Sequence, residues 1–220
     1  MVTKLSESLN SHQFVVTCEL NPPKGINLQP LYKKAELLKN ITTAVNITDS
    51  AGARMSMAPI AVAHLLLNKN IEPILQITGR DRNRVALQSE ILAASALGIR
   101  NILCMSGDPP GGGDHPEAKS VFDLDAIGLL AGAEALKSGQ DISGIGLNGT
   151  PDLFIGAVAN PGSPDLGKEL ERMEEKIEAG ASFFQTQATY EPDVFQKFMY
   201  KASNLNVPIL SGQIVLKSGK

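Results

Sequence analysis

The chain of 220 residues is 43% hydrophobic and 20% charged, with a formal net charge of −3 at pH 7, which fits a globular protein of one large domain or two small ones. Lysine and arginine are scattered along the predicted helices and form no basic stripe, so no nucleic-acid partner is expected. The apolar runs are far shorter than the ~20 residues of a membrane span, and residues 1–12 are too polar for a secretory signal. We therefore expect a cytoplasmic protein without a membrane-bound part.

Seven short apolar runs, rich in β-branched residues, predict buried parallel strands. In chain order they are residues 14–18, 44–47, 71–75, 102–105, 154–159, 183–184 and 207–210. Apolar residues at helical spacing predict helices over residues 28–38, 61–68, 85–97, 123–138, 164–180 and 194–202. Gly98 and Gly139 are placed to end two of these helices. Ser163 followed by Pro164 is typical of a helix start.

The alternation of strands and helices predicts an α/β fold with a parallel sheet covered by helices. An open doubly wound sheet and a closed (β/α)8 TIM barrel both fit, and the even spacing favours the barrel. A complete barrel takes ~250 residues, whereas this chain stops soon after the seventh run, at residues 213–217. We therefore predict a single barrel domain over residues 1–220, truncated after the seventh strand and lacking the eighth strand and the last helices.

Polar residues stand at the end of nearly every predicted strand. They are Glu19, Thr48, Asp49, Gln76, Thr78, Ser106, Asp108, Asn160, Thr186, Gln187 and Gln213, with Gly107 between Ser106 and Asp108. The carboxyl ends of parallel strands converge on one rim of a barrel, where active sites lie. Glu19 is the leading candidate, because a carboxylic acid in a partly apolar pocket has a raised pKa and can donate a proton near neutrality. A structural ion pair would explain Glu19 equally well.

Other motifs have weaker functional interpretations. Residues 144–149 match a dinucleotide-binding fingerprint, but they follow a helix and precede a strand, so we interpret them as a loop. Residues 107–113 open a long segment without obvious structure, which is typical of a functional loop. The charged residues 80–84 either cap the following helix or bind an anion. The three histidines show no metal-binding spacing, and Cys18 and Cys104 are predicted to be buried, reduced thiols, so no metal site is expected.

Several segments carry, in the right order, the motifs of one enzyme family. Residues 17–23, with Glu19 before a double proline, resemble the first strand of methylenetetrahydrofolate reductases, and residues 106–110 resemble that family's fourth-strand signature. Residues 176–187 are similar to its Lys-x-x-Ala-Gly-Ala and Thr-Gln pattern. Four further segments resemble the branch of this family that is fused to homocysteine methyltransferases: residues 46–49, 78–83, 121–123 and 155–161. The resemblance covers nearly the whole chain.

This resemblance implies a flavoprotein barrel that holds FAD at its rim and acts in one-carbon metabolism and methionine biosynthesis. Hydride would pass from NAD(P)H to the flavin, and then to 5,10-methylenetetrahydrofolate, giving 5-methyltetrahydrofolate. Glu19 would be the general acid that protonates N10 of the folate, and the negative charge of Asp108 would favour a cationic iminium. Gln187 and Gln213 would bind the folate. The implied cofactor-binding residues are Thr48, Asp49, Gln76, Ser106, Gly107, Asp108, Val121, Asn160 and Lys176, the last suited to the ribityl or phosphate region.

Three positions depart from the family pattern. Gln76 stands where many members carry histidine, Asn160 where many carry tyrosine, and Ser106 where some carry arginine. Each change removes a ring or a charge beside FAD, so flavin affinity and redox potential are expected to differ. Two alternatives remain: a non-catalytic subunit that docks on a methyltransferase or electron-transfer partner, and a pterin-binding barrel that transfers a methyl group without flavin. The donor (NADH, NADPH or a ferredoxin type) and a homo-oligomeric state stay open.

Overall fold

The computed structural model describes residues 2–215, so Leu216 and Lys217 at the predicted C-terminal end lie outside the described residues. Its strands are β1 (Thr17–Leu20), β2 (Ala44–Ile47), β3 (Pro73–Thr78), β4 (Asn101–Met105), β5 (Phe154–Ala159), β6 (Phe183–Thr186) and β7 (Ile209–Leu210). Its α-helices are α1 (Lys4–Asn10), α2 (Gln29–Leu38), α3 (Pro59–Leu67), α4 (Arg84–Ala96), α5 (Ala126–Lys137), α6 (Leu166–Glu178) and α7 (Pro192–Ala202).

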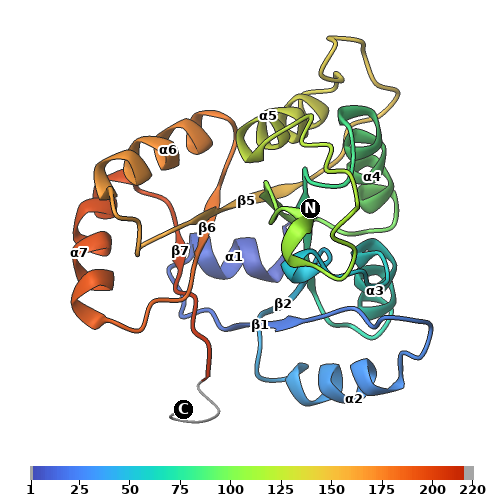
Figure 1. Ribbon diagram of the computed structural model, residues 1–220, viewed down its shortest axis with the longest axis horizontal. Coiled ribbons are helices and arrows are strands. Elements are labelled where there is room, and N and C mark those ends of the chain that lie inside the picture. Colours follow the sequence, from blue (N-terminus) through green and yellow to red (C-terminus); the bar gives the residue numbers. More distant parts are fainter. Residues whose placement is uncertain (1, 216–220) are drawn as a thin grey trace.

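The seven strands form one sheet in sequence order, and every neighbouring pair is parallel. The sheet curls into an incomplete barrel with α2 to α7 around its outside (Figure 1). The predicted barrel-like α/β fold is thus confirmed, and residues 2–215 contain no eighth strand. None of the helices in this part of the chain is long and apolar enough to cross a membrane.

The alternation of side chains along each strand places the polar rim. In β3, Leu75 and Ile77 pack with the helices in the outer core, whereas Ile74 belongs to a separate cluster inside the barrel. Because side chains alternate between the two faces of a strand, Gln76 and Thr78 share the inner face with Ile74. The inside of the barrel therefore changes from apolar at the amino ends of the strands to polar at their carboxyl ends.

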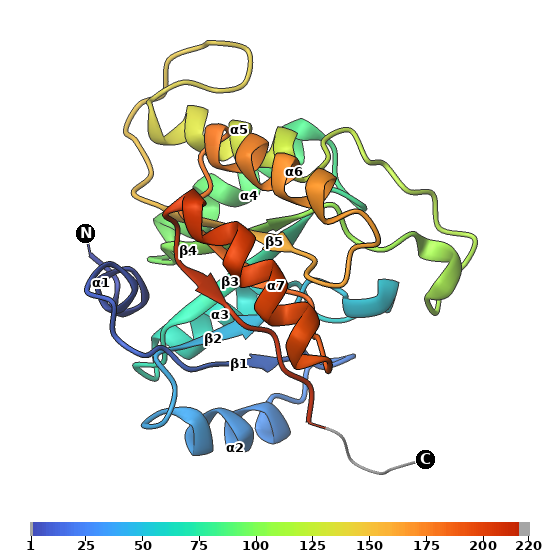
Figure 2. The same cartoon turned by 90° about the vertical axis from the view of Figure 1, so that its left-hand side faces the viewer.

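Helix α1, which the sequence patterns did not predict, closes the amino end of the barrel. Its Leu5 and Leu9 join the inner cluster, and Figure 2 shows the helix at the opposite end of the sheet from the irregular segment after β4. The carboxylate of Glu72 accepts hydrogen bonds from the backbone N–H of Lys4 at 2.8 Å and of Leu5 at 2.9 Å. It also accepts one from the Asn101 side chain at 2.9 Å. A carboxylate at a helix N-terminus is stabilising because it meets unpaired N–H groups.

Replacing Glu72 with Ala should therefore lower the free energy of unfolding by about 1–3 kcal/mol, because three donors lose their acceptor. Urea denaturation measures the change. Glu36→Ala, on the exposed face of α2, is the matched control and should shift stability by less than about 0.5 kcal/mol. Equal midpoints for the two variants would show that α1 is not held by Glu72.

Several strand boundaries were predicted too early. Strand β1 begins at Thr17 and includes Glu19, and β3 extends to include both Gln76 and Thr78. The reason is the pairing: β1 meets β2 from Thr17 onward, and β3 runs alongside β4 as far as Thr78. Strand β7, in contrast, has only two residues, and it follows Pro208, which has no N–H to donate.

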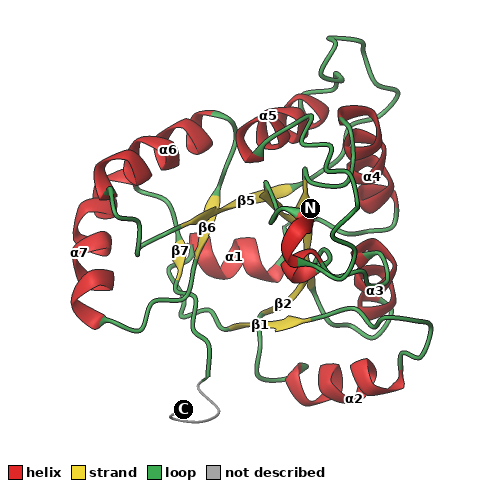
Figure 3. Ribbon diagram, viewed as in Figure 1, coloured by secondary structure: helices red, strands yellow, loops and turns green. Residues whose placement is uncertain are grey.

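Two further predictions were wrong. Helix α6 is capped by Asp165 and not by Ser163: the Asp165 side chain accepts from the Lys168 N–H at 3.1 Å. Both residue types are good N-caps. Here the hydroxyl of Ser163 donates to the Asp165 carbonyl instead. Cys104 is buried as predicted, but Cys18 is half-buried because it lies on β1, an edge strand. Residues 144–149 lie in the loop between α5 and β5, as Figure 3 shows.

Candidate active site

A cavity of about 770 Å³ lies at the carboxyl ends of the strands. It brings together ten of the residues predicted from the sequence: Glu19, Thr48, Asp49, Gln76, Ser106, Gly107, Asp108, Asn160, Lys176 and Gln187. Two other predicted residues do not line it. Val121 is exposed, with its backbone N–H bound to the Arg80 carbonyl at 2.7 Å, and the exposed Gln213 side chain donates to the Ser211 hydroxyl at 2.9 Å.

Glu19 projects into this cavity from β1. Burial against the cavity wall raises the pKa of the Glu19 carboxyl above its usual range, and a hydrogen bond with the Gln76 side chain opposes part of the rise. The Glu19 residue is nevertheless exposed to solvent, which moderates the effect. Glu19 forms no ion pair within the described residues. Because it lines the cavity, it is placed to exchange a proton with a ligand.

The wall beside Glu19 is formed by the ends of β2 and β3. Thr48 is buried and donates its hydroxyl hydrogen to the side-chain oxygen of Asn21 at 2.8 Å. Asp49 is also buried, and its carboxylate accepts from the backbone N–H of Thr78 at 2.9 Å and from its hydroxyl at 2.8 Å. The bonds between Asp49 and Thr78 join the ends of β2 and β3 beyond the last paired residues of these strands, Ile47 and Leu75.

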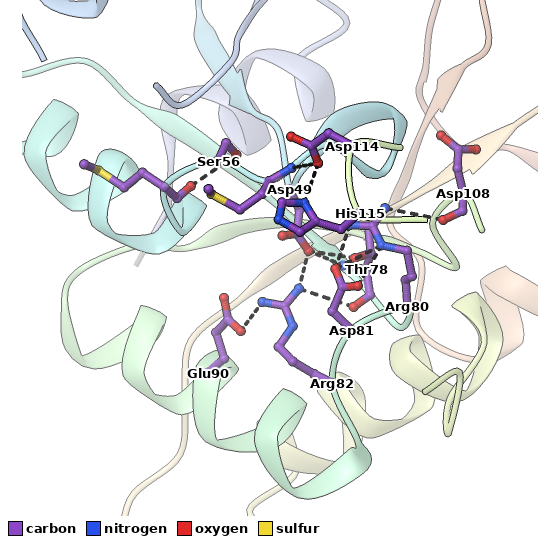
Figure 4. Close-up of polar contacts among 12 residues, drawn as sticks. Asp49, Ser56, Thr78, Arg80, Asp81, Arg82, Glu90, Asp108, Asp114 and His115 are labelled. Carbon is purple, nitrogen blue, oxygen red and sulfur yellow. Dashed lines mark hydrogen bonds and ion pairs between the residues drawn. The ribbon is translucent and has the colours of Figure 1, made fainter. Parts of the chain in front are cut away.

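The next part of the wall is the turn after β4. Gly107 has a φ of +88°, and a Cβ there would lie 3.0 Å from Cβ of Thr78, so glycine fits both the backbone conformation and the space. The Ser106 hydroxyl accepts from the Ala126 N–H at 3.1 Å, at the start of α5. Arg80 is buried and contacts the backbone oxygen of Asp108 at 3.5 Å, while the carboxylate of Asp108 points away from this contact (Figure 4).

The opposite wall carries positive charge from α6. Lys176 is buried, and its ammonium donates to the Val158 carbonyl at 2.7 Å. Burial lowers the pKa of Lys176, and the nearby Glu169 carboxylate opposes this. Arg172 and Glu169 also line the cavity, and Glu169 accepts from the backbone N–H of Asn160 at 2.9 Å. An ammonium with two N–H groups beyond its bond to Val158 can bind an anion here.

Residues 80–84, whose role the sequence left open, make contacts within the fold, and Arg80 also lines the cavity. Asn83 caps α4 by accepting from the Ala86 N–H at 3.0 Å, and Arg80 forms an ion pair with Asp81 at 2.6 Å. Arg82 pairs with both Asp49 and Glu90.

Two lining residues, Arg172 and Glu169, were missed by sequence analysis. Arg172 precedes Lys176 by four residues and therefore lies on the same face of α6. That spacing could have identified it. Cys104 also lines the cavity, but burial raises the pKa of its thiol to about 12, so it stays protonated and unreactive near neutrality. In residues 2–215 no group of three or more histidine, cysteine, aspartate or glutamate side chains could hold a metal ion.

A second ion cluster, the Asp114 latch, joins three loops at the outer edge of the site. Asp114 accepts from the Met55 N–H and from the His115 ring, both at 2.9 Å, and pairs with Lys24. These contacts hold the pKa of the Asp114 carboxyl well below its usual range, chiefly through Lys24. A depressed pKa means that the latch is intact above the pKa of an unfolded aspartate and is lost only in strong acid.

Replacing Asp114 with Ala should free the segment between β4 and α5, because three loops lose their common acceptor. Limited digestion with trypsin should then cut after the exposed Lys119 several times faster than in the parent. Glu117→Ala, in the same segment, serves as the control and should leave the rate unchanged. Identical cleavage of the two variants would contradict the role given to the latch.

A family model and the curated relatives that match this chain carry the same family description. The family model described as methylenetetrahydrofolate reductase matches residues 4–220. Methylenetetrahydrofolate reductase 2 of Schizosaccharomyces pombe is 29% identical over 175 residues, which cover 77% of this chain and 27% of that protein. Methylenetetrahydrofolate reductase (NADH) 1 of Zea mays is 24% identical over 229 residues, 100% of this chain and 38% of that protein. The chain thus spans less than two-fifths of the length of these relatives.

Solved structures share the fold at low sequence identity. An uncharacterised protein from Clostridium thermocellum that binds two copies of 5-methyl-5,6,7,8-tetrahydrofolic acid has a TM-score of 0.57 and 16% identity, covering 94% of this chain and 68% of that one. Phosphonopyruvate hydrolase in complex with oxalate and Mg²⁺ has a TM-score of 0.64 and 19% identity, covering 96% and 72%. These likenesses support the barrel-like fold alone.

Proposed function

Because the chain belongs to the methylenetetrahydrofolate reductase family, we propose that its cavity is the site at which 5,10-methylenetetrahydrofolate is reduced to 5-methyltetrahydrofolate, with FAD and NAD(P)H. One observation carries the proposal: a single cavity joins a carboxyl of raised pKa, Glu19, with a buried ammonium, Lys176. The names of plant and nematode relatives include both NADH and NADPH types, so either nicotinamide fits. The 5-methyltetrahydrofolic acid bound by the Clostridium thermocellum protein agrees with a folate ligand on this fold.

The residues present suit FAD. The cavity volume of about 770 Å³ lies within the range of small-molecule and cofactor sites. Lys176 and Arg172 supply positive charge to a phosphate group, and Gly107 lets the backbone approach a flat ring closely. Thr48, Asp49, Ser106 and Asn160 would complete the cofactor contacts. FAD, when bound, supplies the relay of hydride from the nicotinamide to the folate.

The remaining chemistry is performed by side chains of the chain itself. Glu19, protonated to a higher pH than an ordinary glutamate, would give its proton to N10 of the folate and open the five-membered ring to an iminium. The negative charges of Asp49 and Asp108 would favour this cation. Gln187, exposed at the end of β6, would hydrogen-bond the pterin.

Titration of the flavin-free protein with FAD, followed by flavin fluorescence, tests the cofactor assignment. We expect one FAD per chain. Lys176→Met should weaken binding about 10–100-fold, because a charge-assisted contact worth about 1.5–3 kcal/mol is lost. Lys168→Met, on the exposed face of the same helix, is the control and should bind as the parent does. Failure of the parent protein to bind FAD would refute the proposal, and equal affinities of the two variants would refute the role of Lys176.

A second candidate is a subunit that depends on a partner, such as a methyltransferase or electron-transfer protein. It is favoured by exposed apolar side chains beside both edge strands: Phe14 and Ile26 flank β1, and Ile214 and Val215 follow β7. Purification from the native source distinguishes the two candidates. A flavin-free, inactive chain found only with its partner supports the second, whereas a yellow, active chain supports the first.

A further inference from the structure

The carboxylate of Asp49 uses one of its two oxygens for the fold. Oδ2 accepts from the Thr78 N–H at 2.9 Å, from the Thr78 hydroxyl at 2.8 Å, and from Nη2 of Arg82. No donor from residues 2–215 occupies Oδ1, although Asp49 lines the cavity. Oδ1 is therefore free to bind a ligand in the cavity. It can do so reliably only if the carboxylate is held in one orientation.

Arg82 supplies that fixed orientation. Its guanidinium lies between two acidic side chains, with Nη2 on Asp49 and Nη1 on Glu90 of α4 (Figure 4). The Arg82 side chain is 19% exposed and that of Glu90 13%. Nη2 also contacts the Thr78 carbonyl at 3.3 Å. The rigid fork of arginine can join two carboxylates in one plane, which the single ammonium of lysine cannot do in the same way.

The cluster of Asp49, Arg82 and Glu90 carries costs that a purely stabilising ion pair would not need. Arg82 Nε and Glu90 Oε1 are buried without a hydrogen-bond partner among the described residues, which costs free energy. One guanidinium faces two carboxylates, and burial together with the nearby Asp49 raises the pKa of Glu90 against the opposing effect of Arg82. A buried cluster with such costs is weak evidence for stability, and its one member in the cavity is Asp49.

We propose that Arg82 is a positioning residue for this site: anchored by Glu90, it fixes the Asp49 carboxylate so that Oδ2 binds Thr78 and Oδ1 faces the ligand. Arg82 does not line the cavity, and it acts on the ligand through the Asp49 carboxylate. The ligand in question is the cofactor or folate of the proposed function, on which this part of the inference rests. The placement of Asp49 itself does not depend on that function.

The test compares four variants. Arg82→Lys keeps the charge but loses the fork, and Glu90→Ala removes the anchor. Glu90→Gln keeps a hydrogen-bond acceptor for Arg82 without its charge, and should therefore rescue the anchor. Arg84→Lys is the matched control, since Arg84 also forms a forked pair, with Asp123 at 2.8 and 2.9 Å, but lies outside the cavity and is half exposed.

Amide hydrogen exchange, measured by NMR on the ligand-free protein, reports directly on Asp49, because the Thr78 N–H is bound to it. Relative to the other amides of β3 and β4, the Thr78 amide should exchange about tenfold faster in Arg82→Lys and Glu90→Ala. It should change less than about threefold in Glu90→Gln and Arg84→Lys. If Arg82→Lys does not fold, Glu90→Ala decides the result.

FAD affinity of the same folded variants supplies a measurement that a merely structural role would not change. Arg82→Lys and Glu90→Ala should bind FAD about tenfold more weakly than the parent, and Glu90→Gln and Arg84→Lys as tightly. Unchanged Thr78 exchange, or faster exchange with parental FAD affinity, would overturn the inference. If the parent protein binds no FAD, the proposed function fails, and the exchange pattern alone decides whether Arg82 positions Asp49.

Discussion

Glu19→Gln should lower the rate of folate reduction by about 10²–10⁴-fold, the usual contribution of a general acid. The amide fills the same space but has no proton to give to N10 of the folate. Reduction of bound FAD by the nicotinamide needs no such proton and should be nearly unchanged. The two half-reactions are measured separately by anaerobic stopped-flow absorbance. If both survive unchanged in Glu19→Gln, Glu19 is not the acid.

The pH profile gives an independent check on Glu19. Its carboxyl must be protonated to act, and its pKa is raised by burial. The folate half-reaction should therefore be fastest at low pH and should fall as the pH rises through that raised pKa. Glu19→Gln should lose this fall, whereas Glu36→Gln, on exposed α2, should retain it. A flat profile in the parent protein would argue against proton transfer from Glu19.

Gly79→Ala should cause a large loss of stability. An added Cβ would lie 2.0 Å from the backbone oxygen of Leu124, far inside contact distance. The Gly79 N–H donates to the Met105 carbonyl at 3.1 Å, and its own carbonyl accepts from the Phe122 N–H at 3.1 Å. The Gly79 backbone cannot move away from Leu124 without breaking these bonds, so we expect a cost of about 3 kcal/mol or more.

Urea denaturation of Gly79→Ala measures this cost, and Gly111→Ala is its control. A Cβ at Gly111 would meet nothing within 4 Å, so that variant should change stability by less than about 0.5–1 kcal/mol. Weaker FAD binding should accompany Gly79→Ala, because the displaced segment adjoins the turn at Ser106. Equal unfolding midpoints for the two variants would contradict the packing described for Gly79.

The rim of the barrel was predictable because strand ends are marked by composition. Residues after apolar runs located ten lining residues of the cavity, with Thr78 among them but not Lys176, which lies on α6. They do so because parallel strands place their carboxyl ends together. Their partners were not predictable, because the pairing of Asp49 with Arg82 depends on how β3 and α4 pack. Helix α1 was also missed: its two apolar residues, Leu5 and Leu9, are too few for a periodic signal.

Other residues show where local patterns fail. Val121 was assigned from a motif and Gln213 from its position after the seventh apolar run, but loops position both, and neither side chain lines the cavity. Ser163 and Asp165 are both good caps, and only the packing of α6 decides between them. The departures at Gln76, Asn160 and Ser106 all lie on the cavity wall, so they remain the positions at which flavin affinity and potential are expected to differ from other members of the family.

A single-turnover reaction tests the central proposal most directly. The FAD-loaded protein is reduced with NAD(P)H in the absence of oxygen and then mixed with 5,10-methylenetetrahydrofolate, while flavin absorbance is recorded and the folate is analysed by chromatography. We predict reoxidation of the flavin with one equivalent of 5-methyltetrahydrofolate formed per flavin. A flavin that stays reduced, with the folate recovered unchanged, would contradict the proposal.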